Sequence, residues 1–454
     1  MSLTKQIAQF IYDFEYDQIP EQAIRVIKNA FIDTIAVGIA GSNEDSSKIV
    51  KEFVKSEDSR GVSTIWNSYQ KASPSYAALV NGAMSHALDF DDVNTAVQGH
   101  PSTVIVPTVM AAAEEVGASG KSAILAYFVG FEVMAYAGKL VGVYSYHKGW
   151  HGTATLGVIG ATATAGKLYG LNVEQLEHAI GIAVSNSSGV MQNFGTMTKP
   201  YHPGNAARAA IVSATLAKSG FTANRKIIEG SKGFIALYGD RKEPATTEKI
   251  GEKFELIETG IGVKKYACCY ATHRSADAVL ELLKETTINP EDIKAIHVRG
   301  PKGAFTPVIY TEPITGLEGK FSVELVIAAA FIDHKISLNT FTDCEVQREN
   351  VQRLLCKVTK SEDSSIPIKE NGIMEGFIEL TITLKKEKLV KKISHPKGSA
   401  EWPLTQEELH EKFMDCTNNR LKQSTTSNVW EILDQLENQN ELIELYLLLS
   451  ESKE

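Results

Sequence analysis

The hydrophobic period of this chain changes near residue 255, and that change constrains the fold more than any other feature. Before it, apolar residues recur at helical spacing almost throughout. After it, the stretches IGVKKYACC, IKAIHVRG and FIELTITL are rich in β-branched residues, which indicates strands. The helical period returns near residue 405. We therefore expect a mostly helical α+β protein, with a helical domain at 1–255, an α+β domain at 256–400, and helices at 401–454 that return to the first domain.

Helix-capping signals and apolar spacing predict the individual helices. Pro20 begins a helix that ends near Gly41 and Ser42. Many helix positions are Ala or Gly, as in GVIGATATAG, so the helix axes can approach closely. Further helices are expected at 75–89, 107–116, 121–141, 154–169, 173–186, 205–219, 271–285, 321–331 and 345–359, whereas 62–67 fits either a strand or a loop.

Composition excludes several classes of partner. The 454 residues carry a net charge of -9 with no basic stripe, which argues against a nucleic-acid or anionic-membrane surface. The most apolar stretch, 123–143, contains Glu132 and Lys139, so we interpret it as a buried helix. The N-terminus is amphipathic, unlike a secretory signal, and the five cysteines lack zinc or iron-sulfur spacing. We expect a cytoplasmic protein with reduced thiols and with neither a metal nor another cofactor.

The stretch SHALDFDDVNTAVQGHPS concentrates imidazoles and carboxylates between two helices. His86 and Asp89 lie three residues apart, on one face of a helix. We interpret Asp91 and Asp92 as solvated and His86 as a hydrogen-bonded core histidine. Asp89 and His100 are interpreted as functional, because burying either group costs free energy that a task would explain.

Three further loops combine small residues with basic side chains. His151 lies in KGWHGT, Lys199 precedes Pro200 in GTMTKPYHPGNAAR, and His273 lies in CCYATHRSADAV. We expect an extended approach at Lys199, with His202 and Gly204 at the start of the next helix, where a partial positive charge favours an anion. Each feature also has a structural interpretation, as a turn histidine, a solvated lysine or a histidine at a helix start. All of them lie where a loop becomes a helix, and both domains contribute.

Several motifs in order resemble the MmgE/PrpD family. They are HALDFDD followed by GHPS, then GWHGT, GTMTKPYHPGNAARAA, ATHRSADA and HPKGSAEWPLTQEELHEKF. The family contains 2-methylcitrate dehydratase, cis-aconitate decarboxylase and iminodisuccinate epimerase, and the resemblance covers nearly the whole chain. It implies a homodimer in which each chain has a large helical domain and an inserted α+β lid domain.

The resemblance also implies a set of site residues, matched position by position. The catalytic residues are Asp89, His100, His151, Lys199 and His273, and we add Lys199, His202, Gly204 and Arg274 as substrate-binding residues. Two positions depart from the decarboxylase pattern, since Val93 replaces a threonine and Leu325 a tyrosine. The resemblance therefore leaves dehydration, decarboxylation and epimerisation open.

Chemistry next to a carboxylate requires a base, an acid and fixed cations. We expect Lys199 to hold the carboxylates of a small di- or tricarboxylate, with His100 and His151 as the acid/base pair. Asp89 would orient a histidine, and His273 would complete the site from the lid. Two alternatives remain open: a metal-dependent hydrolase that uses the His/Asp cluster around Asp89, and a carboxylate-binding protein without catalytic activity.

Overall fold

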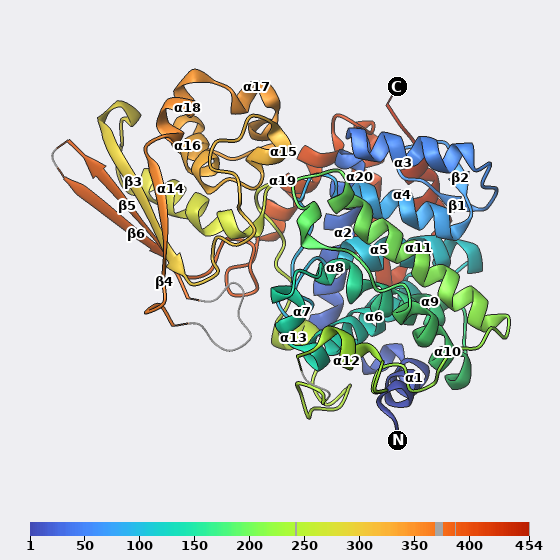
Figure 1. Cartoon of the computed structure of the whole chain (residues 1–454). Helices are drawn as coiled ribbons and strands as arrows, with labels where there is room; N and C mark the ends of the chain where they lie inside the picture. The colour runs from blue at the N-terminus through green and yellow to red at the C-terminus, as the bar shows by residue number, and fades with distance from the viewer. Residues whose placement is uncertain (241–242, 368–375, 386, 454) are drawn as a thin grey trace. The chain divides into compact units, whose positions relative to one another are not determined.

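The computed structural model describes residues 1–240, 243–367, 376–385 and 387–453. The chain divides into two compact units. Unit 1 comprises Met1–Asn193, Met197–Ile261 and Thr405–Glu454, and unit 2 comprises Phe194–Thr196 and Gly262–Leu404. Figure 1 shows helices throughout unit 1 and the main sheet in unit 2. The predicted fold class, a mostly helical α+β protein, is confirmed.

Six helices form the centre of unit 1. They are α2 (Glu21–Gly41), α4 (Pro74–His86), α5 (Ser102–Val116), α6 (Gly120–Val141), α9 (Gly157–Leu168) and α11 (Thr198–Lys218). Helix α4 packs on α11, and α6 packs on α9. Small residues permit both contacts, since a Cβ atom on Gly204 would collide with the carbonyl oxygen of Leu79, and one on Gly160 would lie 2.6 Å from that of Gly130.

Shorter elements surround this centre. They are α1 (Leu3–Asp13), α3 (Asp45–Ser56), α7 (Tyr144–His147), α8 (Gly152–Thr155), α10 (Val173–Val184), α12 (Phe234–Tyr238), α13 (Glu255–Glu258), and the two-residue strands β1 (Ser63–Thr64) and β2 (Lys71–Ala72). The C-terminal segment adds α19 (Gln406–Thr417), α20 (Gln423–Asp434), the 3₁₀ turn η6 (Leu436–Asn438) and α21 (Ile443–Ser450). Both α19 and α20 pack against α2, so the two ends of the chain share one core.

Unit 2 contains a four-stranded sheet in the order β4-β3-β5-β6. The strands are β3 (Ile293–Pro301), β4 (Val358–Asp363), β5 (Ile378–Leu384) and β6 (Lys388–Ile393), and only the β3–β4 pair is parallel. Alternate residues of β5 are buried, as its sequence pattern predicts, and α14 (His273–Glu285) packs against β5 and β6. The other helices are α15 (Gly316–Gly319), α16 (Val323–Asp333), α17 (Asp343–Val346) and α18 (Glu349–Leu355).

Several sequence-based expectations about secondary structure are wrong, including that of a helix continuing from His86 to Asp89, since α4 ends at His86. The helix expected over 345–359 ends at Leu355, and Val358 and Thr359 belong to β4, where they pair with β3. The stretch IGVKKYACC is not a strand; its side chains are largely buried, but its backbone makes only isolated bonds, such as Val263 N–H to Gly398 O. The helix expected over 154–169 is interrupted at Leu156, between α8 and α9.

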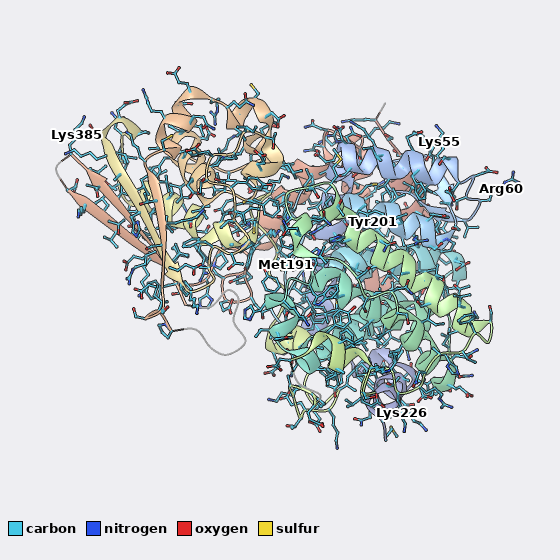
Figure 2. All side chains as sticks on the ribbon, in the orientation of Figure 1. Lys55, Arg60, Met191, Tyr201, Lys226 and Lys385 are labelled. Carbon is cyan, nitrogen blue, oxygen red and sulfur yellow. The ribbon has the colours of Figure 1, made fainter. Side chains whose placement is uncertain are left out.

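Helix α6 is long and apolar enough to cross a membrane by length and composition alone. Its most apolar 18-residue window is 89% buried inside the protein, and Glu132 within it accepts hydrogen bonds from the backbone N–H groups of Glu255 and Leu256. Helix α6 is thus a core helix, as its sequence predicts. Charged side chains such as Lys55, Arg60 and Lys385 instead project from the surface (Figure 2).

Candidate active site

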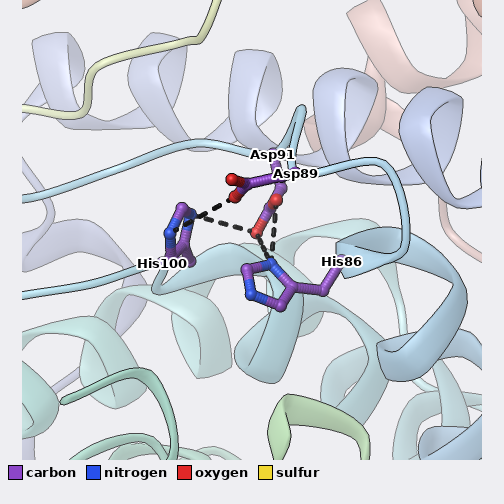
Figure 3. Close-up of side chains that lie close together, drawn as sticks. All are labelled: His86, Asp89, Asp91 and His100. Atoms are coloured by element: carbon purple, nitrogen blue, oxygen red, sulfur yellow. Dashed lines mark hydrogen bonds and ion pairs between the residues drawn. The ribbon is translucent and has the colours of Figure 1, made fainter. Parts of the chain in front are cut away.

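The candidate site begins where α4 ends at His86. Asp89 has a φ of +52°, in the left-handed region that few residues other than glycine, Asn and Asp adopt. Its N–H donates to the carbonyl oxygen of His86, and the chain then turns toward α5. This turn directs the side chains of Asp89 and Asp91 toward His86 and His100 (Figure 3).

Asp91 contacts two imidazoles in a largely buried cluster. Its carboxylate lies 2.8 Å from His86 Nδ1 and 3.3 Å from His100 Nδ1 (Figure 3). Burial favours the protonated acid, but the interactions with His86 and His100 outweigh it and hold the pKa of Asp91 well below its usual range. The expectation that Asp91 is solvated is therefore wrong, and His86, as expected, is a hydrogen-bonded buried histidine.

The partners of each ring fix the tautomers of His86 and His100. Burial lowers the pKa of His86 to about 3, so this ring is neutral, and its Nδ1 must donate because ionised Asp91 only accepts. The Nδ1 atom of His100 lies 2.8 Å from the carbonyl oxygen of Asp92, which also only accepts. In a neutral His100 ring the lone pair is consequently on Nε2, 3.9 Å from Asp89 Oδ1.

Lys199 closes the cluster from α11. Its Nζ lies 2.8 Å from Asp89 Oδ1 and 3.0 Å from His86 Nε2, and its side chain is 6% exposed. The ammonium group therefore donates to both a carboxylate and a neutral imidazole. A fixed positive charge in a largely buried site is what a substrate carboxylate requires.

His151 precedes α8 and lies beside the same cluster. Its ring centroid is 5.9 Å from that of His86 and 6.5 Å from that of His100. Its Nδ1 lies 3.0 Å from His202 Nδ1. Burial, followed by the charge of Lys199, holds the pKa of His151 well below its usual range and lowers that of His202 to about 4. Two neutral rings in this contact share one hydrogen, so the tautomer of one determines that of the other.

Asp92, whose carbonyl oxygen lies 2.8 Å from His100 Nδ1, is a further buried acid. Asp92 accepts a hydrogen bond from the N–H of Ser102 at 3.1 Å, and its other oxygen forms a short contact with Ser102 Oγ, which also bonds Tyr127 OH. Burial raises the pKa of Asp92 to about 8. The expectation that Asp92 is solvated is also wrong, because its side chain anchors the start of α5.

Helix α11 begins seven residues earlier than expected. The extended approach predicted at Lys199 is wrong because α11 starts at Thr198, which places Lys199 and Pro200 in its first turn. A proline there loses no helical hydrogen bond, since the first N–H groups of a helix have no partner within it. His202 and Gly204 consequently lie inside the helix and not at its start, and Gly204 packs against α4.

His273 and Arg274 begin α14 in unit 2, and both are buried. His273 Nε2 lies 3.3 Å from the carbonyl oxygen of Cys268, and the centroid of its ring lies 5.1 Å from those of Tyr266 and Tyr270. Burial lowers the pKa of Arg274 to about 10. In the same unit Leu325 is a buried residue of α16.

The predicted residues of unit 1 other than Gly204 thus lie together, whereas two of their partners, His86 and Asp91, were not assigned a role in the lyase. His86 and Asp91 lie among Asp89, His100, His151 and Lys199, and His202 contacts His151. A signal for His86 was present in the sequence, since it ends an otherwise apolar helix, whereas nothing local marked Asp91, five residues later, as buried. The ligand atoms of His86, Asp89, Asp91 and His100 lie within 4.8 Å of one another, which is also compatible with a metal ion.

Comparison with known proteins places the chain in one family along most of its length. The MmgE/PrpD N-terminal domain matches residues 5–247, and the MmgE/PrpD C-terminal domain matches residues 266–438. Human cis-aconitate decarboxylase is 29% identical over 99% of this chain and 94% of its own length. The enzymes of that name from mouse and Aspergillus terreus are 28% and 26% identical, over 96% and 98% of this chain and 91% and 95% of their own lengths. The chain therefore belongs to the MmgE/PrpD family.

Proposed function

We propose that this protein is a lyase that acts next to a carboxylate of a small polycarboxylate, with cis-aconitate as the first candidate substrate. The observation that carries the proposal is the buried Lys199 ammonium, held between Asp89 and His86 beside His100 and His151. Relatives named cis-aconitate decarboxylase, which match this chain over almost its whole length, support the choice of substrate.

Lys199 binds a substrate carboxylate in this proposal, and the imidazoles move protons. His100 Nε2 is suited to the role of base because its Nδ1 is held by backbone and carboxylate oxygens. His151 is suited to either role, since the single hydrogen between its Nδ1 and that of His202 sets whether its Nε2 carries a proton. Asp89 keeps Lys199 in place and faces His100.

Decarboxylation of cis-aconitate balances with these groups alone. The bond between the methylene carbon and its carboxylate breaks, and carbon dioxide leaves. The released electron pair forms a new double bond between the former methylene carbon and the central carbon. The pair of the original double bond moves to the far carbon, which takes a proton from one imidazolium or imidazole N–H. Dehydration would instead use one histidine to remove a proton and the other to protonate the leaving hydroxyl. Epimerisation would place the two histidines on opposite faces of one carbon.

Proton NMR in deuterated buffer tests the proposal and separates these reactions. The protein is incubated in turn with cis-aconitate, citrate, 2-methylcitrate and iminodisuccinate. We expect new vinyl signals with deuterium incorporated at one carbon, and the substrate that gives them identifies the reaction. Exchange without net conversion would indicate an epimerase. The absence of both exchange and conversion with all four compounds would contradict the proposal.

A metal-dependent hydrolase is the second candidate, favoured by the close approach of His86, Asp89, Asp91 and His100. Two contacts argue for the lyase instead. Lys199 Nζ already approaches Asp89 Oδ1 and His86 Nε2 as a cation would, and a divalent ion beside an ammonium group is repelled. Overnight chelation followed by assay decides between the two, because the lyase retains its activity and the hydrolase loses it.

We also propose that His273 is a catalytic residue and that Arg274 binds substrate. His273→Ala tests the catalytic role, and Arg274→Gln tests the binding role. We expect the first to lower kcat and the second to raise KM, because a lost proton donor slows chemistry whereas a lost cation weakens carboxylate binding. Unchanged kinetic constants in either variant would remove that residue from the mechanism.

A further inference from the structure

A buried lysine of the C-terminal segment contacts the loop that carries Asp89 and Asp91. Lys412 lies in α19, more than 300 residues from this loop in sequence, and is 6% exposed. Its Nζ lies 2.6 Å from Asp33 Oδ1 on α2 and donates to the carbonyl oxygen of Phe90 at 2.8 Å. The same ammonium group lies 3.9 Å from the centroid of the Phe90 ring.

The carbonyl group of Phe90, which Lys412 contacts, lies in the backbone between the two carboxylates of the candidate site. Phe90 lies between Asp89, whose φ of +52° is in the sparsely populated left-handed region, and Asp91, which bonds both His86 and His100. A conformation of this kind persists only where surrounding contacts hold it. Lys412 supplies such a contact at the peptide group that links the two carboxylates.

A purely structural ion pair between the same parts of the fold provides a comparison. Lys28, also on α2, bonds Glu437 of η6 at 2.9 Å, and it too is 6% exposed. This pair likewise ties α2 to the C-terminal segment. Among the residues that the structure describes, Lys28 makes no hydrogen bond or ion pair with the loop at 87–101, whereas Lys412 does. Burial of an ammonium group is costly unless it is paired, so both lysines need their carboxylates, but only Lys412 also holds a backbone carbonyl of the site.

We infer that Lys412, held by Asp33, is a positioning residue that fixes Asp89 and Asp91 in their catalytic orientation. Its effect on turnover rests on the proposed lyase function, whereas its effect on the loop does not. Lys412 acts through the backbone, so its loss displaces the carboxylates without removing any group that touches substrate. A displacement of about 1 Å in a catalytic site can cost about 100-fold in rate.

The test compares Lys412→Met with Lys28→Met, which removes the matched ion pair. Hydrogen–deuterium exchange followed by mass spectrometry reports on the peptide that covers residues 87–101 and requires no activity. We expect exchange in this peptide to be at least severalfold faster in Lys412→Met and unchanged in Lys28→Met. On cis-aconitate we expect kcat to fall more than about tenfold in Lys412→Met with a much smaller change in KM, and to change less than about twofold in Lys28→Met.

Two further variants keep the inference testable if Lys412→Met does not fold. Lys412→Arg retains the charge beside Asp33 and should recover part of the lost kcat. Asp33→Asn retains the shape but loses the charge that holds the ammonium group, and should speed loop exchange to an intermediate degree. Wild-type exchange at 87–101 in the folded Lys412 or Asp33 variants would overturn the inference. A wild-type protein without turnover would count against the proposed function alone, because loop exchange still decides the role of Lys412.

Discussion

Lys199 Nζ lies 2.8 Å from Asp89 Oδ1 and so pairs a lysine of α11 with a carboxylate from the loop after α4. The two side chains are each 6% exposed, and His86 Nε2 accepts a second hydrogen bond from the same ammonium group at 3.0 Å. The pair therefore combines a positive charge that can hold an anion with a carboxylate that keeps it in place. This relationship connects the two segments on which the proposed chemistry depends.

Replacement of Lys199 by methionine should lower kcat/KM on cis-aconitate by roughly 100-fold or more, because it removes the fixed charge on which carboxylate binding and charge stabilisation depend. Steady-state kinetics measure the change, and circular dichroism checks that the fold is retained. The matched control is Lys218→Met, at the exposed end of the same helix, which should retain wild-type kinetics. Near-normal turnover in Lys199→Met would remove this residue from the mechanism.

Removal of the lysine charge should also convert the His/Asp cluster into a metal site. In Lys199→Ala the ligand atoms of His86, Asp89, Asp91 and His100, all within 4.8 Å of one another, no longer face an ammonium group. We expect Zn²⁺ to raise the Tm of Lys199→Ala and to leave that of the wild type unchanged, since only a ligand that binds the folded state stabilises it. The double variant Lys199→Ala, Asp91→Asn should lose the effect. Equal stabilisation of wild type and Lys199→Ala by zinc would contradict the view that Lys199 is the resident cation.

Local sequence signals were sufficient to predict most helices and to select most of the residues of unit 1 that lie together in the candidate site. Asp89, His100, His151 and Lys199 could be selected because each lies at or near a helix end, where a polar side chain points away from the helix core. Asp91 and Asp92 could not, because nothing local distinguishes a solvated acidic pair from a buried one. Their burial depends on His86, His100 and Ser102, which only the tertiary structure supplies.

The errors in secondary structure have a similar origin. Proline normally favours an extended residue before it, but Pro200 lies in the first turn of α11, where helix geometry tolerates it. The stretch IGVKKYACC has the composition of a strand but is not paired along its length, so its buried side chains pack without a ladder. Lys412 lies at the end of the last family motif, but its local sequence indicated no role, because its importance comes from Asp33 and Phe90, both distant in sequence.

The contact between His151 and His202 predicts that His202 controls the proton carried by His151. His202→Leu removes the nitrogen that lies 3.0 Å from His151 Nδ1 and should lower kcat by about tenfold or more, with a shifted pH–rate profile. His202→Asn places an amide near the lost Nδ1 and should recover much of the rate. If His202 bound substrate only, both variants would raise KM and leave kcat and the pH profile unchanged, and kinetics across pH separate the two roles.

The buried Asp92 predicts that stability declines as the pH rises from about 4 to about 8. Burial raises its pKa from 3.8 to about 8, so the folded state keeps a proton that the unfolded state has lost above pH 3.8. The stabilising contribution is therefore complete below pH 3.8 and is lost as the pH rises toward 8, with a slope on the order of 1 kcal/mol per pH unit. Asp92→Asn resembles the protonated acid and should make the free energy of unfolding, measured by urea denaturation, nearly independent of pH between pH 7 and 8.

Glu132→Gln is the matched control. Burial raises the pKa of Glu132 only to about 7, so its replacement should change the pH dependence mainly below that pH. An Asp92→Asn protein whose stability declines as steeply as that of the wild type between pH 7 and 8 would show that Asp92 is ionised in the fold.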